Sequence, residues 1–391
     1  TLSTQATRAM RVGKSESATV IPDTMKAARV SDYGDDAAKV LTIEEGVKVP
    51  TLEDTPPAEF KDSMLIKVLS VALAPGDVRV MSGKTRELQG PPGGPPYTPG
   101  GDVCGIVVQV PEDEKCRFRV GQRVAARFLN KPMGALGEYA LVSMSVCDVV
   151  PDDSISSNEA AALVSSATVA VILADRIKKG DRVLIFGAGG GVGSHLCQLA
   201  RLRGASFVAG VARDTQRLLE KPLCCDQAID YTATDPFSIQ TFKDDPFDVI
   251  VDLSCGNFPK IVASKSKSKK SIIKSASKGG RYYTTNPDKP VFELHSWYGA
   301  MKVFLFPALW RAIYSRSIYR YSLPSYSYVF ALPETSDIVT RTLNLANEGE
   351  LQASIDPQAP FPFTTEGLRD AFKLQGSYHA KGKVVISVSE E

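Results

Sequence analysis

The chain has 391 residues, 43% of them hydrophobic, which is enough to bury a large core and to form two domains. Its 46 basic and 44 acidic residues nearly balance, so we expect no nucleic-acid partner. The seven cysteines are odd in number and scattered without a CxxC pair, which argues against a disulfide framework. With only three histidines as well, the sequence predicts no metal site.

Residues 1–24 are expected to lie outside the folded core. The first twenty are rich in Ser and Thr, carry Arg8, Arg11 and Lys14, and contain one acid, Glu16. This composition is typical of a transit-peptide remnant, and equally of a flexible arm. It favours an organelle, mitochondrion or plastid, over the cytoplasm. No apolar run of about 18 residues occurs, so no membrane span is predicted.

Residues 25–150 have the pattern of a small, strongly bent β-barrel. Glycine-punctuated alternating runs predict strands at residues 64–71, 102–110, 123–128, 137–142 and 146–150. The loop at residues 90–101, which contains Tyr97, is too rich in Pro and Gly for a helix or a central strand.

From residue 151 strands and helices alternate, which predicts an α/β fold with a doubly wound parallel sheet. A helix capped by Ser156 or Ser157 is expected to run towards Lys178. The predicted strands are residues 183–186, 206–211, 227–229, 248–253 and 281–284, and helices follow at 335–347 and 365–374. A final strand at 383–388 alternates like a barrel strand, so the C-terminus is expected to return to the first domain.

Residues 183–203 combine a short apolar strand, a glycine-rich turn and an amphipathic helix. Such a turn presents backbone N–H groups at a helix N-terminus, where the helix dipole favours an anion, usually a dinucleotide pyrophosphate. The expected phosphate-binding residues are Ala188, Gly189, Gly190, Gly191, Val192 and Gly193. Counting back from Gly193, the pattern departs from GxGxxG because Ala188 replaces the first glycine. His195, in the first helical turn, is expected to pack rather than act as a base.

Two segments have biased composition. Residues 263–278 are rich in Lys and Ser, which indicates a solvated helix face or loop, or else a docking patch for an acidic partner or a membrane. Residues 291–332 are rich in aromatic side chains with interleaved cations. Such a stretch favours a substrate-pocket wall, a subunit interface or an interfacial amphipathic helix over a nucleic-acid surface.

Several phrases, in this order, resemble the medium-chain dehydrogenase/reductase superfamily and its zinc-free quinone oxidoreductase branch. They are Ala160-Ala161-Ala162-Leu163 with Thr168, the glycine turn, Gln227-Ala228-Ile229-Asp230-Tyr231, Phe247-Asp248-Val249-Ile250-Val251-Asp252, Gly279-Gly280-Arg281-Tyr282, and His379-Ala380-Lys381-Gly382-Lys383-Val384-Val385. Within the branch, the aromatic run before Asp337-Ile338 and the phrase Phe361-Pro362-Phe363 look most like the mitochondrial reticulon-interacting oxidoreductases. The chloroplast-envelope quinone oxidoreductase homologues are almost as similar.

The resemblance implies a GroES-like β-barrel domain from residues 25–150 and 350–391, and a Rossmann domain from residues 151–349. Zinc-dependent relatives carry Gly-His-Glu where this chain has Gly100-Gly101-Asp102, so the metal-free branch is implied. The same resemblance assigns Thr168, Tyr231 and Lys383 to the cofactor site.

The end of the second Rossmann strand favours NADPH over NADH as cofactor. NAD enzymes place an acid there, about 20 residues past the glycines, to bind the ribose hydroxyls. Val211 stands at that position here, and Arg213 or Arg217 is expected to pair with the 2′-phosphate. Asp214 is the exception, with a helix cap as its alternative role.

The resemblance implies hydride transfer from NADPH to a quinone or an α,β-unsaturated carbonyl compound. The family often carries Asn-Pro-x-Asp where this chain has Ala74-Pro75-Gly76-Asp77, so the usual Asn donor is missing and turnover is uncertain. The candidate catalytic residues are Tyr97, as an O–H donor, and Asp77, whose alternative is a turn cap. The alternatives are a 2-enoyl thioester reductase, or a weakly active subunit that binds NADPH within a larger assembly. Contact with a membrane or protein complex, and a homodimer, are left open.

Overall fold

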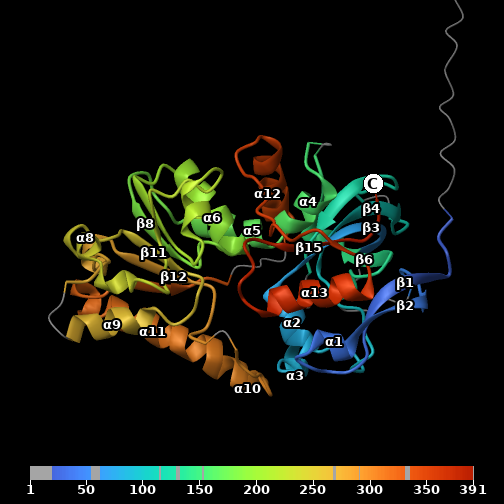
Figure 1. Cartoon of the computed structure of the whole chain (residues 1–391), viewed down its shortest axis with the longest axis horizontal. Helices are drawn as coiled ribbons and strands as arrows, with labels where there is room; N and C mark the ends of the chain where they lie inside the picture. The colour runs from blue at the N-terminus through green and yellow to red at the C-terminus, as the bar shows by residue number, and fades with distance from the viewer. Residues whose placement is uncertain are drawn as a thin grey trace, which may run out of the picture.

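The structure is a computed structural model that describes residues 20–53, 62–113, 116–128, 133–151, 154–266, 270–289, 291–330 and 335–390. The Ser/Thr-rich arm, residues 1–19, lies outside these ranges, and so do residues 267–269 of the Lys/Ser-rich segment. The described chain forms two lobes, one built around a parallel sheet and one around an antiparallel sheet (Figure 1).

The antiparallel lobe combines strands from both ends of the chain. Its seven-stranded sheet has the order β14–β15–β3–β4–β5–β7, and β6 also pairs with β3. The strands are β3 (Ser63–Leu73), β4 (Asp102–Gln109), β5 (Arg123–Ala126), β6 (Tyr139–Ser143), β7 (Cys147–Val149), β14 (Phe361–Pro362) and β15 (Val384–Ser387). The antiparallel pairing of β15 with β3 returns the C-terminus to this lobe, as its alternating pattern predicted.

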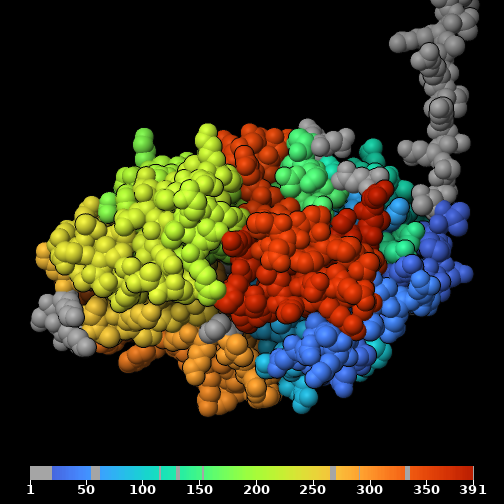
Figure 2. Space-filling view, in the orientation of Figure 1, coloured from blue at the N-terminus to red at the C-terminus, as the bar shows by residue number. Residues whose placement is uncertain are grey.

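Short elements surround this sheet. They are the antiparallel pair β1 (Thr24–Val30) and β2 (Leu41–Lys48), and the helices α1 (Ala37–Val40), α2 (Pro75–Met81), α3 (Arg86–Gln89) and α13 (Thr365–Gly376). The space-filling view shows the C-terminal segment, in red, packed against both the parallel lobe and the N-terminal elements (Figure 2). The C-terminal segment therefore joins the two lobes.

The parallel lobe is a Rossmann sheet. Its strands follow the order β10–β9–β8–β11–β12–β13, and every neighbouring pair is parallel. In chain order this is 3-2-1-4-5-6, the arrangement that binds dinucleotides at the carboxyl ends of its strands. The strands are β8 (Arg182–Phe186), β9 (Phe207–Val211), β10 (Gln227–Ile229), β11 (Val249–Asp252), β12 (Arg281–Thr284) and β13 (Ser325–Tyr328).

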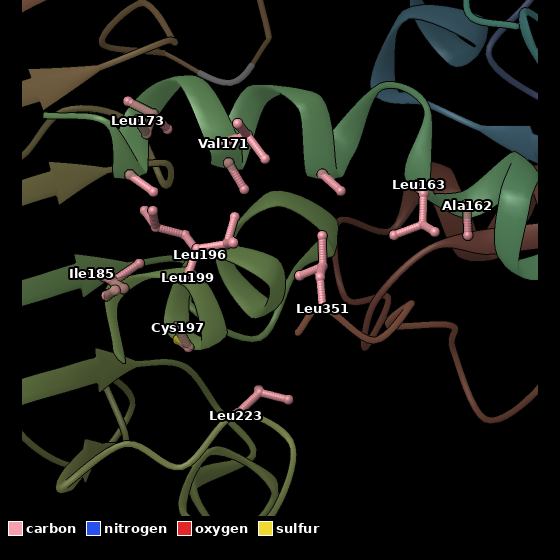
Figure 3. Close-up of a cluster of buried hydrophobic side chains, with 14 of the residues drawn as sticks. Ala162, Leu163, Val171, Leu173, Ile185, Leu196, Cys197, Leu199, Leu223 and Leu351 are labelled. Atoms are coloured by element: carbon pink, nitrogen blue, oxygen red, sulfur yellow. The ribbon is translucent and has the colours of Figure 1, made fainter. Parts of the chain in front are cut away.

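Helices α4 (Ser157–Leu163), α5 (Ser166–Ala174), α6 (Gly191–Leu202), α7 (Thr215–Leu219), α8 (Gln240–Asp244), α9 (Phe258–Ser266) and α12 (Asp337–Asn347) complete the Rossmann half. Leu196 and Leu199 of α6 meet Val171 and Leu173 of α5 in its apolar core (Figure 3). A fully buried leucine contributes roughly 1.5–3 kcal/mol, so this packing fixes where α6 begins.

The prediction of one continuous helix after Ser156 or Ser157 is wrong in one respect. The structure has two helices there, α4 and α5, with a break between them. Ser165, at the break, donates its hydroxyl to Asp102 of β4 (2.6 Å). Among the described residues no single helix is long and apolar enough to cross a membrane. The α4–α5 pair, bent by 50°, reaches that length and composition only when taken together.

The aromatic segment forms a projecting helical rod. It consists of α10 (Trp297–Ala300), a π-helical turn (Met301–Leu305) and α11 (Phe306–Arg316), followed by a short 3-10 turn (Ile318–Tyr321). The rod leaves the Rossmann half and reaches towards α2 and α3 (Figure 1). Leu294, just before it, donates its N–H to the carbonyl of Lys84 (2.8 Å).

Candidate active site

The glycine turn follows β8 and opens α6. The N–H groups of Gly187 and Ala188 both donate to the carbonyl of Val211 on β9 (3.1 Å each), which fixes the turn against the neighbouring strand. A Cβ on Gly193 would lie 2.2 Å from the carbonyl oxygen of Gly187, so only glycine lets α6 approach β8 this closely. The first N–H groups of α6 have no intrahelical acceptor, an arrangement that suits an anion. The turn therefore fits a dinucleotide pyrophosphate.

Cations gather beside this turn, at the end of β9. Arg213 is exposed, and its guanidinium lies 3.1 Å from Nε2 of His379. Lys381, which the sequence reasoning did not assign, pairs with Asp214 (2.8 Å). Asp214 also accepts the N–H of Arg217 and caps α7, which is the alternative role expected for it. Together Arg213, Arg217 and Lys381 make this end of the cleft cationic.

Arg217 is held more tightly than a solvent-facing phosphate ligand. Its guanidinium donates to the carbonyl of Gly189 (3.4 Å) and to Oγ of Ser354 (2.5 Å), and burial lowers its pKa. Ser354 in turn donates its N–H to Nε2 of His195 (3.0 Å). His195 is fully buried and its pKa is lowered to about 3 by burial, so it is neutral and packs α6 against the C-terminal segment.

Lys383 forms a buried ion pair within the antiparallel lobe, beside the glycine turn. Its side-chain carbons lie against Gly191, where an added Cβ would meet Cδ at 3.1 Å. Its ammonium group donates to the carbonyl of Leu73 (2.6 Å) and pairs with Asp102 (3.0 Å), with both side chains almost fully buried. Lys383 thus reaches the phosphate turn with its stem, while its charge is neutralised by Asp102.

Asp77 is buried at the N-terminus of α2. It accepts the N–H of Ala74 (2.7 Å) and the N–H of Gly100 (3.1 Å), and so ties α2 to the proline-rich loop. Burial is the main reason that the pKa of Asp77 is raised to about 7, and the nearby Asp102 raises it further. These contacts match the capping alternative. Tyr97 is 6% exposed, and its buried hydroxyl has no hydrogen-bond partner among the described residues, so its O–H is free for a ligand.

Of the residues predicted to bind the cofactor, Thr168 is buried in the core and Tyr231 is exposed at the surface. Thr168 is fully buried in α5, where its hydroxyl donates to the carbonyl of Val164 (2.7 Å) and lies 3.3 Å from the hydroxyl of Thr342. Its hydroxyl is therefore used inside the core, and Ser166 is the α5 residue that lies against Gly191. Tyr231 follows β10 and is 49% exposed, beside the cationic end of the cleft.

A cavity of about 780 Å³ lies between α1, α2, α13 and the segment before the aromatic rod. Arg79 of α2 lines it, and its guanidinium stacks on Phe292 at 5.2 Å from the ring centroid. No local pattern marks this residue, because the tertiary structure decides which side of a seven-residue helix faces a cavity. In the described ranges no group of three or more His, Cys, Asp or Glu residues lies close enough to hold a metal ion.

Two family descriptions match the chain. The alcohol dehydrogenase GroES-like domain covers residues 61–152, and the zinc-binding dehydrogenase family covers residues 223–386. The chain belongs to the medium-chain dehydrogenase/reductase superfamily. Within this superfamily it falls in the quinone oxidoreductase-like branch, a group of oxidoreductases.

Relatives in this superfamily extend over most of the chain. It is 29% identical over 374 residues to the chloroplastic NADPH-dependent alkenal/one oxidoreductase of Arabidopsis thaliana, which covers 94% of this chain and 80% of that protein. It is 33% identical over 185 residues to the quinone oxidoreductase of Sus scrofa, covering 46% and 50%. The quinone oxidoreductase from Coxiella burnetii shares the fold, with a TM-score of 0.68 at 22% identity over 94% of this chain and all of that one.

Proposed function

We propose that the protein is a zinc-independent, NADPH-dependent oxidoreductase that reduces an α,β-unsaturated carbonyl compound or a quinone. The carrying observation is the glycine turn at α6, flanked by Arg213 and Lys381 and open towards the cleft. The named activities of its relatives support the proposal, since they include the Arabidopsis alkenal/one oxidoreductase and the 2-methylene-furan-3-one reductase of Solanum lycopersicum. We place the domains at residues 25–150 with 350–391, and at 151–349.

The residues at the turn fit NADPH. The N–H groups at the start of α6 would hold the pyrophosphate, and Arg213 with Lys381 would hold the 2′-phosphate. Arg217 and Lys383 would support the site without contacting the phosphates. The guanidinium of Arg217 holds the turn at Gly189 and joins it to Ser354 of the C-terminal segment, and the ammonium group of Lys383 is paired with Asp102. When bound, the cofactor supplies a hydride to the β-carbon of the acceptor and leaves as NADP⁺.

The chain's own groups would orient the acceptor and stabilise the charge that develops on its oxygen. Tyr97 offers an O–H in a buried setting, where a hydrogen bond to a developing oxyanion is strong. Asp77 positions α2 and the loop that carries Tyr97 through its two backbone contacts. The α-carbon of the reduced acceptor then takes a proton from solvent. Ala74 supplies no donor, so Tyr97 replaces the Asn of many relatives in this proposal.

Two alternatives predict different behaviour. A 2-enoyl thioester reductase would oxidise NADPH with crotonyl-CoA in preference to an alkenal. A subunit that holds NADPH without turnover would bind the cofactor tightly but would not oxidise it with any acceptor. The test is to mix purified protein with NADPH and follow the loss of NADPH absorbance with p-benzoquinone, phenanthrenequinone, an alkenal and crotonyl-CoA. Rapid loss with the alkenal or a quinone supports the proposal, and tight binding without oxidation by any acceptor refutes it.

For location and partners we propose a plastid, because the Arabidopsis relative and a Spinacia oleracea quinone-oxidoreductase homologue are named chloroplastic. A membrane contact is best supported at the exposed apolar ridge of the aromatic rod. Its side chains are at least 38% exposed: Trp297, Tyr298, Met301, Leu305, Phe306, Leu309, Trp310 and Ile313. No Asp or Glu occurs from residue 294 to 333, which suits an anionic lipid surface. The Lys/Ser-rich patch is less suited, since Lys270 and Lys274 pair with Asp244 and Asp248.

Vesicle flotation tests the ridge. We expect binding to an equimolar mixture of phosphatidylcholine and phosphatidylglycerol, and loss of binding in Trp297→Ser/Trp310→Ser. The matched control is Val120→Ser, which removes a single exposed apolar side chain far from the rod in sequence. Unchanged flotation of the double variant would remove the membrane assignment. A change in its oligomeric state instead would identify the ridge as a contact between copies of the chain.

A further inference from the structure

Arg79 places a cation in the cavity beside the candidate active site. It lies two residues beyond Asp77 on α2, and Asp77 fixes that helix to the proline-rich loop. The central carbon of its guanidinium lies over the ring of Phe292, 5.2 Å from the centroid, within reach of a cation–π interaction. The cavity is bounded on the opposite side by α13 and Tyr378.

Among the residues that the structure describes, none accepts a hydrogen bond from the guanidinium of Arg79. Within the described residues it makes no hydrogen bond or ion pair, and its Nε is shielded from solvent without a partner. Two other cations of the cavity wall are engaged: Lys84 pairs with Asp35 (2.6 Å), and Arg369 donates to the carbonyl of Leu41 (3.0 Å). Lys373 lies exposed at the rim. Arg79 is therefore the uncompensated cation of the inner wall.

The acidic residues of the cavity wall do not neutralise the positive charge of Arg79. Asp35 forms an ion pair with Lys84, and Asp36 caps α1 by accepting the N–H of Ala38 (3.0 Å). Glu366 and Asp370 line the same cavity from α13 and are exposed, and among the described residues neither forms an ion pair with Arg79. The groups that do face Arg79 are Tyr378, Tyr328, Cys255 and Asp77. Of these only Asp77 is a carboxyl group. Burial raises its pKa to about 7, so it is only partly ionised near neutral pH, and both of its oxygens already accept backbone N–H groups.

Arg79 is partly buried, and arginine does not escape an unfavourable environment by losing its proton, so an anion beside its guanidinium, whose Nε is shielded, would stabilise it. Tyr328 ends β13 and Cys255 follows β11, so Arg79 faces the carboxyl ends of the Rossmann strands, where ligands of such sheets bind. The planar fork of arginine matches a carboxylate with two parallel hydrogen bonds.

We propose that Arg79 binds a carboxylate carried by the electron acceptor, so that the preferred acceptor is an unsaturated ketone or aldehyde with a carboxylate at its far end. This rests on the proposed reductase function and names the substrate class for the same site. Arg79 acts as a specificity-determining residue: it recognises the acceptor's tail, while hydride transfer takes place at the enone. Neutral enones fill the same cavity without using the cation.

The test compares (E)-6-oxohept-4-enoate with its methyl ester, which differ only in the charge of the tail. We expect the wild type to favour the acid in kcat/KM by roughly ten- to a hundredfold, the value of a charge-assisted hydrogen-bond pair. Arg79→Met should remove this preference by raising KM for the acid and leave the ester unchanged, and Arg79→Lys should keep part of it. The matched control is Arg86→Met, an exposed arginine paired with Glu87 outside the cavity wall.

A binding measurement separates this site from the reductase proposal. Titration with 6-oxoheptanoate, which has no double bond to reduce, should release heat with the wild type and with Arg86→Met but not with Arg79→Met. Equal losses of kcat for acid and ester in Arg79→Met would assign Arg79 to the reacting carbonyl and overturn the proposal. Equal binding of 6-oxoheptanoate by wild type and Arg79→Met would also overturn it. If no enone is reduced but this binding depends on Arg79, the carboxylate site stands and the reductase function fails.

Discussion

The close approach of α6 to β8 makes Gly193→Ala the sharpest test of the phosphate turn. The added Cβ would lie 2.2 Å from the carbonyl oxygen of Gly187 and 2.7 Å from Cα of Ala188, both backbone atoms that no rotamer change can move. Ordinary contacts are about 3.5 Å, so the start of α6 must shift by roughly 1 Å. Such overpacking costs about 1–3 kcal/mol of the free energy of unfolding. The shifted N–H groups should also weaken NADPH binding by about tenfold or more.

Gly190→Ala provides the matched control within the same turn. Its Cβ would lie 3.6 Å from the same carbonyl oxygen, an ordinary contact, and the backbone at φ −82° and ψ 178° suits alanine. We expect its unfolding free energy to change by no more than about 0.5 kcal/mol. Denaturant unfolding followed by far-ultraviolet circular dichroism, with and without NADPH, measures both effects. Equal stability of the two variants would refute the argument from helix–strand distance.

Three further outcomes follow from the cleft. Arg213→Ala combined with Lys381→Ala should raise the Kd for NADPH about tenfold by fluorescence titration and leave NADH unchanged, whereas equal losses would contradict the 2′-phosphate assignment. Burial lowers the pKa of His195 from 6.5 to about 3, so its contribution to stability is present above pH 6.5 and lost as pH falls towards 3. His195→Gln should flatten the fall in unfolding free energy across that window, and parallel curves would show that His195 does not cause it. Lys383→Met leaves Asp102 buried without its partner and should cost about 3–5 kcal/mol in denaturant unfolding, partly recovered by adding Asp102→Asn; full stability of the single variant would contradict a buried pair.

The local parts of this structure were predictable from the sequence. Strands β10 and β12 begin and end at the predicted residues, and Gly349 stops α12 with a φ of +74°. These signals arise from neighbouring residues, because a glycine turn or a helix stop is fixed by the backbone within a few positions. By contrast, β1, β2 and β13 were not predicted, since their short runs acquire strand character only by pairing with distant segments.

The polar contacts between distant parts of the chain could not be predicted. Lys383 and Asp102 are 281 positions apart and meet only because β15 returns to β3. Lys381 approaches Asp214 for the same reason, and Arg79 faces a cavity formed by α13 and Phe292. No local pattern encodes such meetings. Arg213 and Arg217 were predicted from the end of β9, whereas Lys381 and Arg79 emerged only from the tertiary structure.

Transfer of a labelled hydride is the most direct test of the central claim. Purified protein would be given NADPH deuterated at C4 on the transferred face, together with an alkenal, and the product analysed by mass spectrometry and NMR. Hydride delivery to the β-carbon predicts one deuterium there, with the proton at the α-carbon drawn from solvent. A product without deuterium, or with deuterium at the carbonyl carbon, would contradict an enone reductase.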